Sequence, residues 1–299
     1  MSRRNWLLFF LVGFLWGIPY LLIRVAVRDF SPATVVFFRV VIGAAILVPI
    51  SIYEKSFTSA VRGFKYVLIY AVAEIIGPWF LITKAETNLP SGLAGLLVAT
   101  VPIWSTIFAS QAGDKTVWHH KRLIGLVIGF VGVVALVGIE SFSGQSALWA
   151  ILFVLLAAVG YGYAINMITQ KLPHVSGIAI NALAMAMATV VYAPLARWPR
   201  VHVSTNSLLA AITLGVLPTA LAFVLFFKVM NEIGPARASL VTYLNTACAV
   251  LLGVLILSEP LTLGIAIGLP LVLIGSFLAS RKPIQAEKKS SGGSEKLKP

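Results

Sequence analysis

Charged residues are scarce in this sequence, and acidic residues are scarcest of all. Lys, Arg, Asp and Glu make up 11% of the 299 residues, and only 10 side chains are Asp or Glu. Soluble domains carry roughly 25% charged residues. Hydrophobic residues reach 59%, with a mean hydropathy of +0.95. This balance excludes an ordinary soluble domain and predicts an all-α integral membrane protein.

The sequence also lacks the motifs that pumps and enzymes need. Cys248 is the only cysteine, so an internal disulfide is excluded. No G-x-x-x-x-G-K-[ST] motif occurs, which argues against ATP-driven transport. Asp29, Asp114 and all four histidines fall in predicted connections, where His119 and His120 are expected to be solvated. We therefore predict no enzyme activity, no cofactor and no metal site.

Long charge-poor segments recur along the chain. Each is near 20 residues long, which is enough to cross a hydrocarbon core of about 30 Å. We predict ten transmembrane helices, over Trp6–Val27, Pro32–Ile52, Phe64–Thr83, Ser91–Ala112, Leu123–Ile139, Ala147–Gln170, Val175–Ala196, Ser204–Phe227, Ala236–Leu257 and Thr262–Ser280. The connections are too short to form a domain of their own, so function is expected among the helices.

The placement of Lys and Arg predicts the orientation. With ten spans both termini share one side, and that side holds 17 of these residues against 5 on the other, with Arg39 alone well inside a span. Positive residues favour the cytoplasmic side. We therefore expect a multi-pass protein of the plasma (bacterial inner) membrane with cytoplasmic termini. A net charge of +13 would suggest nucleic acid in a soluble protein, but here the placement of the basic residues is the better guide, so the expected contacts are lipid and substrate, not nucleic acid.

The two halves of the sequence resemble each other at an offset of about 145 residues. Trp16–Gly17 aligns with Tyr161–Gly162, Lys84 with Lys228, and the segment from Ala94 with that from Ala238. Five helices per repeat is an odd number, so the second half must enter the membrane from the opposite side. We predict two inverted five-helix repeats, residues 1–141 and 142–284, followed by a disordered cytoplasmic tail, residues 285–299.

Inverted repeats are common in secondary transporters, where interrupted helices near the midplane mark the substrate site. In the third helix of each half, Glu74 aligns with Pro218, next to the segments GPWF and LAFV. Proline removes a backbone donor and disturbs a helix. We expect the substrate path between the halves, with hinges at Gly17, Pro19, Pro102 and Pro218.

Two charges lie at membrane depth, where each costs at least about 2.5–3.5 kcal/mol. Arg39 and Glu74 are 7 and 9 residues from the outer ends of their helices, which places them within about 3 Å in depth at 1.5 Å per residue. One interpretation is a structural ion pair. The other is that Glu74 exchanges a proton or meets a substrate ammonium group.

Aromatic and polar side chains on the same helices supply the other candidates for the site. A binding pocket combines apolar walls with a few placed polar groups, and Thr242, Asn245 and Thr246 share one helix face. The predicted substrate-binding residues are Trp16, Tyr20, Glu74, Pro78, Trp79, Thr100, Tyr163, Asn166, Thr219, Phe223, Thr242, Tyr243, Asn245 and Thr246. Threonines that bond only to their own helix are the alternative.

The segments AGLLVATVPIWSTIF and LLGVLILSEPLTLGIAIGLPLVLIGSFLA, the FLWG start and the Arg39 of FFRVVIGA resemble the EamA-type members of the drug/metabolite transporter superfamily. Within that group the aromatic first and third helices look most like YddG-type exporters. The resemblance implies export of aromatic and other neutral amino acids, or of related small metabolites, by alternating access. One departure is the ninth helix, where Asn245 and Thr246 replace the usual proline.

Three other functions fit the same sequence. A multidrug exporter of this fold would prefer cations and would depend on an acidic residue such as Glu74. A channel would conduct ions, and a non-transporting receptor would show no saturable flux. A monomer is one expectation, and the sequence leaves the oligomeric state, coupling ion and exact substrate open.

Overall fold

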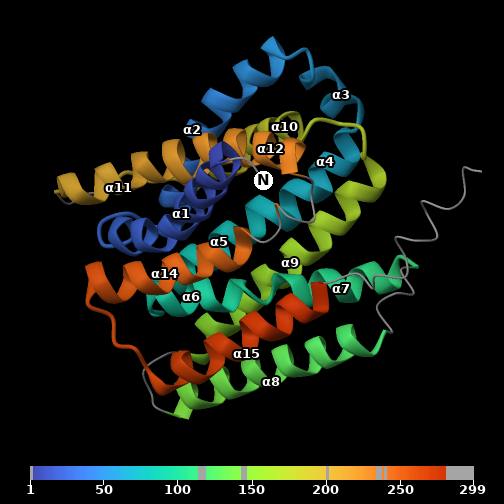
Figure 1. Ribbon diagram of the computed structural model, residues 1–299. Helices are drawn as coiled ribbons and strands as arrows, with labels where there is room; N and C mark the ends of the chain where they lie inside the picture. The colour runs from blue at the N-terminus through green and yellow to red at the C-terminus, as the bar shows by residue number, and fades with distance from the viewer. Residues whose placement is uncertain are drawn as a thin grey trace, which may run out of the picture.

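A computed structural model describes residues 3–113, 119–142, 147–199, 202–233, 238 and 241–280; the predicted tail, residues 285–299, lies outside these ranges. Every regular element in them is a helix, and the helices form one bundle (Figure 1). The first half of the chain contains α1 (Arg3–Ala26), α2 (Pro32–Tyr53), α3 (Phe57–Arg62), α4 (Phe64–Tyr70), η1 (Ala71–Ile76), α5 (Gly77–Ala85), α6 (Ser91–Val98), α7 (Val101–Gln111) and α8 (His120–Phe142).

The second half continues in the same way after residue 146. Its helices are α9 (Leu148–Lys171), α10 (Gly177–Tyr192), α11 (Thr205–Gly215), η3 (Val216–Leu221), α12 (Ala222–Ile233), α14 (Val241–Leu257) and α15 (Leu263–Ser280). The elements η1 and η3 are π-helical and lie within otherwise α-helical runs.

Among the described residues, six helical runs are long and apolar enough to cross a membrane. They are Arg3–Ala26, Pro32–Tyr53, Phe64–Ala85, Ser91–Gln111, Leu148–Lys171 and Thr205–Ile233. Shorter apolar helices cover Gly177–Tyr192, Val241–Leu257 and Leu263–Leu278, and α8 adds a helix of 23 residues. All of these overlap predicted spans.

The outer surface of the bundle is apolar. Large hydrophobic side chains are exposed on many helices, among them Leu7, Phe130, Val190 and Leu255. In water such surface would drive aggregation, because soluble monomers rarely expose large apolar patches. Lipid around the bundle accounts for it, and the chain is consistent with a membrane protein.

Both α2 and α11 begin at a side-chain cap. Ser31 accepts a hydrogen bond from the Thr34 backbone N–H, and Pro32 follows in the first turn of α2, where its missing N–H costs nothing. Ser204 accepts from the Ser207 N–H in the same way at the start of α11. Both helix starts are thus encoded locally.

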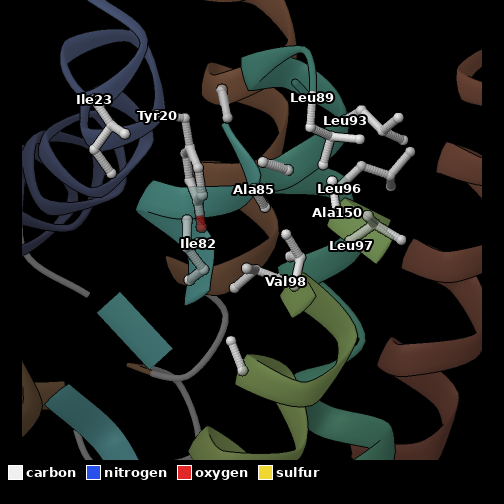
Figure 2. Close-up of a cluster of buried hydrophobic side chains, with 14 of the residues drawn as sticks. Tyr20, Ile23, Ile82, Ala85, Leu89, Leu93, Leu96, Leu97, Val98 and Ala150 are labelled. Carbon is white, nitrogen blue, oxygen red and sulfur yellow. The ribbon is translucent and has the colours of Figure 1, made fainter. Parts of the chain in front are cut away.

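Helices of the first half pack against helices of the second half in a reciprocal pattern. α1 packs along α14, while α9 packs along α6 and α7. α2 packs along α10, and α8 lies alongside α15 at one edge of the bundle (Figure 1). The core is shared accordingly: Figure 2 shows Tyr20 of α1 and Ala150 of α9 in the same buried cluster as Leu93 and Leu97 of α6.

The matched glycines of the two halves allow close approach of these helices. A Cβ on Gly17 would lie 3.0 Å from the carbonyl oxygen of Asn245 in α14. A Cβ on Gly162 would lie 2.7 Å from the backbone nitrogen of Ser105 in α7. Both distances are too short for a side chain, so glycine is required where the first helix of one half crosses the fourth-helix segment of the other.

The third helical run of each half contains a π-helix, and the two π-helices begin 145 residues apart, at Ala71 and Val216. A proline accompanies each of them: Pro78 lies just after η1, and Pro218 lies within η3. Pro218 has no N–H to give to the Leu214 carbonyl four residues back, and the Thr219 hydroxyl donates to that carbonyl instead, at 2.8 Å. At η1 the Gly77 N–H bonds back to the Val72 carbonyl. Proline therefore accounts for these interruptions.

We predict that Gly162→Val destabilises the protein. The new side chain would collide with the backbone of α7, and overpacking of this kind costs about 1–3 kcal/mol. Thermal unfolding in detergent should show a melting temperature lower by several degrees. Val190→Leu, on a side chain that is 75% exposed, is the control and should melt like the wild type. Equal melting of Gly162→Val and wild type would refute the close crossing.

Candidate functional site

Arg39 lies where the two halves meet. Its Nε donates a hydrogen bond of 2.9 Å to the Thr219 hydroxyl of η3. Its guanidinium carbon lies 3.5 Å from the ring centroid of Trp79 in α5, a cation–π distance. Three elements, α2, α5 and η3, therefore meet at one charged group, which we call the Arg39 cluster (Arg39, Trp79, Thr219).

The ion pair expected between Arg39 and Glu74 is not formed. In the described part of the chain the ion pair present is Arg4–Glu232, at 3.4 Å. The expectation rested on equal depth in two regular helices, but equal depth does not set the direction of a side chain around its helix. Glu74 lies within the π-helix η1, where the angular register of the residues changes.

Glu74 is half-buried, and its Oε2 is buried without a hydrogen-bond partner among the described residues. The nearby polar groups are phenols: Tyr70 and Tyr161 both lie in electrostatic range of this carboxylate. Tyr70 itself donates to the Asn181 side chain of α10, at 3.2 Å. A buried, unpartnered carboxyl group can bind a proton or a cationic group.

Aromatic rings line the contact between α1 and α12. The Trp16 ring lies 5.7 Å from that of Phe223, edge to face, and 4.6 Å from that of Phe226. Trp79 of α5 and Tyr161 of α9 also lie close enough for their side-chain polar groups to interact. Pro78 is buried beside Trp79 at the start of α5. These contacts join predicted residues of both halves.

The fourth-helix segment of the first half is broken. α6 ends at Val98 and α7 begins at Val101, with Pro102 in its first turn. Thr100 is buried and donates to the Leu97 carbonyl. From α9, the Asn166 amide donates to the Ser105 hydroxyl at 2.8 Å and to the Ser105 carbonyl at 2.9 Å. Asn166 thus ties α9 to the segment just after the break.

The corresponding segment α14 is continuous. Thr246 donates to the Thr242 carbonyl and to the Asn245 side chain, and both Asn245 and Thr246 are buried. These polar groups are therefore satisfied within their own helix. The missing proline gives the reason for the difference between α14 and the broken α6–α7 segment.

Two predicted aromatic residues make other contacts. Tyr163 is 39% exposed, and its ring packs edge to face on Phe108. Tyr243 packs on Phe277 of α15. No described contact joins either residue to the Arg39 cluster.

The predicted hinges lie in different local settings. α1 is continuous through Pro19, and Gly17 serves the close contact with α14. Pro102 follows a helix break, and Pro218 lies inside η3. Among the described residues no group of three or more His, Cys, Asp or Glu side chains gathers as a metal site would require.

Sequence reasoning missed three residues that the structure brings into the site region. Tyr161 enters the sequence analysis only through its alignment with Trp16. Tyr192 of α10 donates to the Ile76 carbonyl of η1 at 2.6 Å. Glu86, directly after α5, is fully buried, and both carboxyl oxygens lack a hydrogen-bond partner within the described ranges. Glu86 escaped notice because it follows the end of a predicted span.

Glu86 lies among other charged groups at one end of the bundle. The Arg24 guanidinium donates to its backbone carbonyl, and a cavity of about 260 Å³ lies beside it, lined by Arg24, Val27, Arg28 and Thr87. Glu259 lies near as well, and its carboxylate accepts hydrogen bonds from the Ser91 and Gly92 N–H groups at the start of α6, at 2.8 and 3.0 Å. Burial first, and the Glu259 charge second, raise the pKa of Glu86 well above its ordinary value.

The model of the EamA-like transporter family matches the chain twice, over residues 4–138 and 148–281. The uncharacterized transporter YoaV of Bacillus subtilis is 27% identical over 278 residues, covering 89% of this chain and 93% of that protein. The uncharacterized inner membrane transporter YedA of Escherichia coli K12 is 25% identical over 289 residues, covering 93% of each.

A solved crystal structure shares the fold. It aligns with a TM-score of 0.62 at 20% sequence identity, over 93% of this chain and 97% of the other. At this identity the likeness concerns the fold alone.

We predict a pH-dependent stability that Glu86 controls. A raised pKa in the folded state favours the protonated carboxyl, so stability is full below the unfolded pKa, about 4.5, and falls as pH rises toward the folded pKa. Melting temperatures in detergent should therefore fall from pH 5 to pH 9. Glu86→Gln should reduce this fall and melt higher than wild type at pH 8.

Glu54→Gln provides the matched control, because Glu54 is exposed. That variant should follow the wild-type profile. A Glu86→Gln profile parallel to wild type would contradict the buried carboxyl.

Proposed function

Because the chain belongs to the EamA-like transporter family, with both halves of the chain matched, we propose that it is a secondary transporter that exports amino acids, aromatic and other neutral ones, or related small metabolites, from the cytoplasm. The relatives are named as transporters, one of them of the inner membrane. That role is non-enzymatic. The proposed location is the plasma (bacterial inner) membrane with both termini in the cytoplasm.

The observation that carries the proposal is the pair of π-helices at matching positions. Each is bonded by a side chain from the second helix of the other half: Arg39 of α2 to Thr219 of η3, and Tyr192 of α10 to Ile76 of η1. Interrupted helices at the contact between repeats are where secondary transporters bind their substrates. This reciprocity supports ten spans arranged as two inverted repeats, residues 1–141 and 142–284.

The proposed mechanism is alternating access. The halves would rock about their shared contact so that the site opens to one face at a time, and a substrate shifts the populations only by binding one state better. Trp16, Phe223 and Trp79 would hold an apolar side chain. Glu74 would meet a substrate ammonium group or a proton.

A multidrug exporter is the second candidate, and the half-buried Glu74 favours it. A carboxyl group with an unpartnered oxygen beside aromatic rings would also attract an amphipathic cation. The two functions differ in their substrates, and transport assays separate them.

The test is uptake into proteoliposomes of radiolabelled phenylalanine and threonine, against a cationic dye, with and without a pH gradient. We predict saturable amino-acid flux that Trp79→Ala lowers about tenfold or more, because a stacked aromatic wall is lost. Trp149→Ala, at an indole that is 38% exposed, is the matched control and should keep wild-type flux. A response to both the gradient and Glu74→Gln would indicate proton coupling.

Flux of the dye alone would move the assignment to multidrug export. No flux of any substrate through folded, inserted protein would contradict the transporter proposal. Ion conductance without saturation would instead favour a channel.

A further inference from the structure

Arg39 carries a charge within a membrane-spanning helix and has no acidic partner. A guanidinium has five N–H donors, and here only the Nε–H is engaged, by Thr219. Within the described part of the chain no carboxylate oxygen lies within 4.0 Å of Arg39, and the terminal nitrogens make no hydrogen bond. Because an unpaired charge at membrane depth is costly, it calls for a counter-ion.

The guanidinium is also held in one orientation. Its carbon lies 3.5 Å from the Trp79 ring centroid, so the indole covers one face, while Thr219 fixes the Nε edge. The opposite edge, which carries the terminal nitrogens, presents a planar fork. A fork of this kind matches a carboxylate, which accepts two parallel hydrogen bonds from it.

The groups around Arg39 do not neutralise it. Its electrostatic neighbours are the Tyr161 and Tyr20 hydroxyls and the more distant Glu86 carboxyl. Glu86 lies beyond ion-pair distance and shares its surroundings with Glu259 and Arg24. Glu74, the partner expected from the sequence, is not paired with Arg39 either. Arg39 is therefore a fixed positive group for which the described residues supply no counter-ion.

We propose that Arg39 binds the carboxylate of the transported substrate, so that the substrate class is α-amino acids and related carboxylates, not simple amines. This inference rests on the proposed transport function of the same site. The bound carboxylate supplies the missing negative charge, and Trp79 forms an apolar wall beside it. α2 and η3 belong to different halves of the chain. A carboxylate at this point therefore contacts the boundary between the halves, here called the seam, which alternating access must open.

Three ligands that share one phenyl group test the proposal. Phenylalanine carries both charged groups, 3-phenylpropionate lacks the ammonium group, and phenethylamine lacks the carboxylate. Uptake of labelled phenylalanine into proteoliposomes, with the other two as competitors, gives the apparent affinity for each. Wild type should bind phenylalanine and 3-phenylpropionate through Arg39.

Arg39→Gln should weaken the two carboxylates about tenfold to a hundredfold, the range of a charge-assisted hydrogen bond, and leave phenethylamine unchanged. Arg39→Lys keeps the charge but not the fork, so its affinity for the two carboxylates should fall between those of wild type and Arg39→Gln. Thr219→Val removes the Nε partner but leaves the fork, and should weaken the two carboxylates less than Arg39→Gln does.

A purely structural role for Arg39 would give the opposite pattern. Arg39→Gln would then change all three ligands by the same factor, and Thr219→Val would reproduce its effect. Either that result, or a wild type that binds phenethylamine as tightly as phenylalanine, would overturn the carboxylate site.

Thermal stabilisation in detergent separates this inference from the proposed function. If wild type moves no phenylalanine, amino-acid export fails as a proposal. Stabilisation by 3-phenylpropionate that Arg39→Gln abolishes would still support the carboxylate site. Absence of stabilisation by every carboxylate in folded wild type would overturn it.

Discussion

Polar groups inside apolar surroundings must find partners within the protein, and this constraint connects the two halves of the molecule. Pro218 leaves the Leu214 carbonyl without its helical donor, Thr219 supplies one, and the same hydroxyl then accepts from Arg39 of the other half. Tyr192 bonds to the Ile76 carbonyl of η1 in the opposite direction. The irregular parts of each half are therefore completed by the other half.

These hydrogen bonds between the halves place the proposed substrate site at the seam. Arg39 of α2 bonds to η3 and Tyr192 of α10 bonds to η1, so the charge and the two π-helices lie at contacts between the halves. Other bonds between the halves join α4 to α10 and α7 to α9. A movement of one half against the other would exchange or break the bonds of Arg39 and Tyr192. The groups proposed to bind the substrate would thus also hold one conformation together.

Much of this arrangement could be predicted from the sequence. Hydropathy located the apolar helices, and the 145-residue offset matched Gly17 with Gly162, which make equivalent crossings. The ion pair expected between Arg39 and Glu74 was wrong, because depth follows from residue counting but side-chain direction depends on the π-helices. Glu86 was missed because burial at a helix end depends on neighbours such as Arg24 and Glu259, which lie far away in the sequence.

The most direct test of the proposed alternating access is whether the contact between the two halves opens to both sides of the membrane. Cys248 is the only cysteine, so a Cys248→Ser background can carry a single cysteine at Phe223, which is half-buried against Trp16. Membrane-impermeant thiol reagents are then applied to either face of oriented vesicles. Alternating access predicts labelling from each face and a change in the ratio of the two when substrate is added. Labelling from one face alone, whatever the substrate, would contradict alternating access.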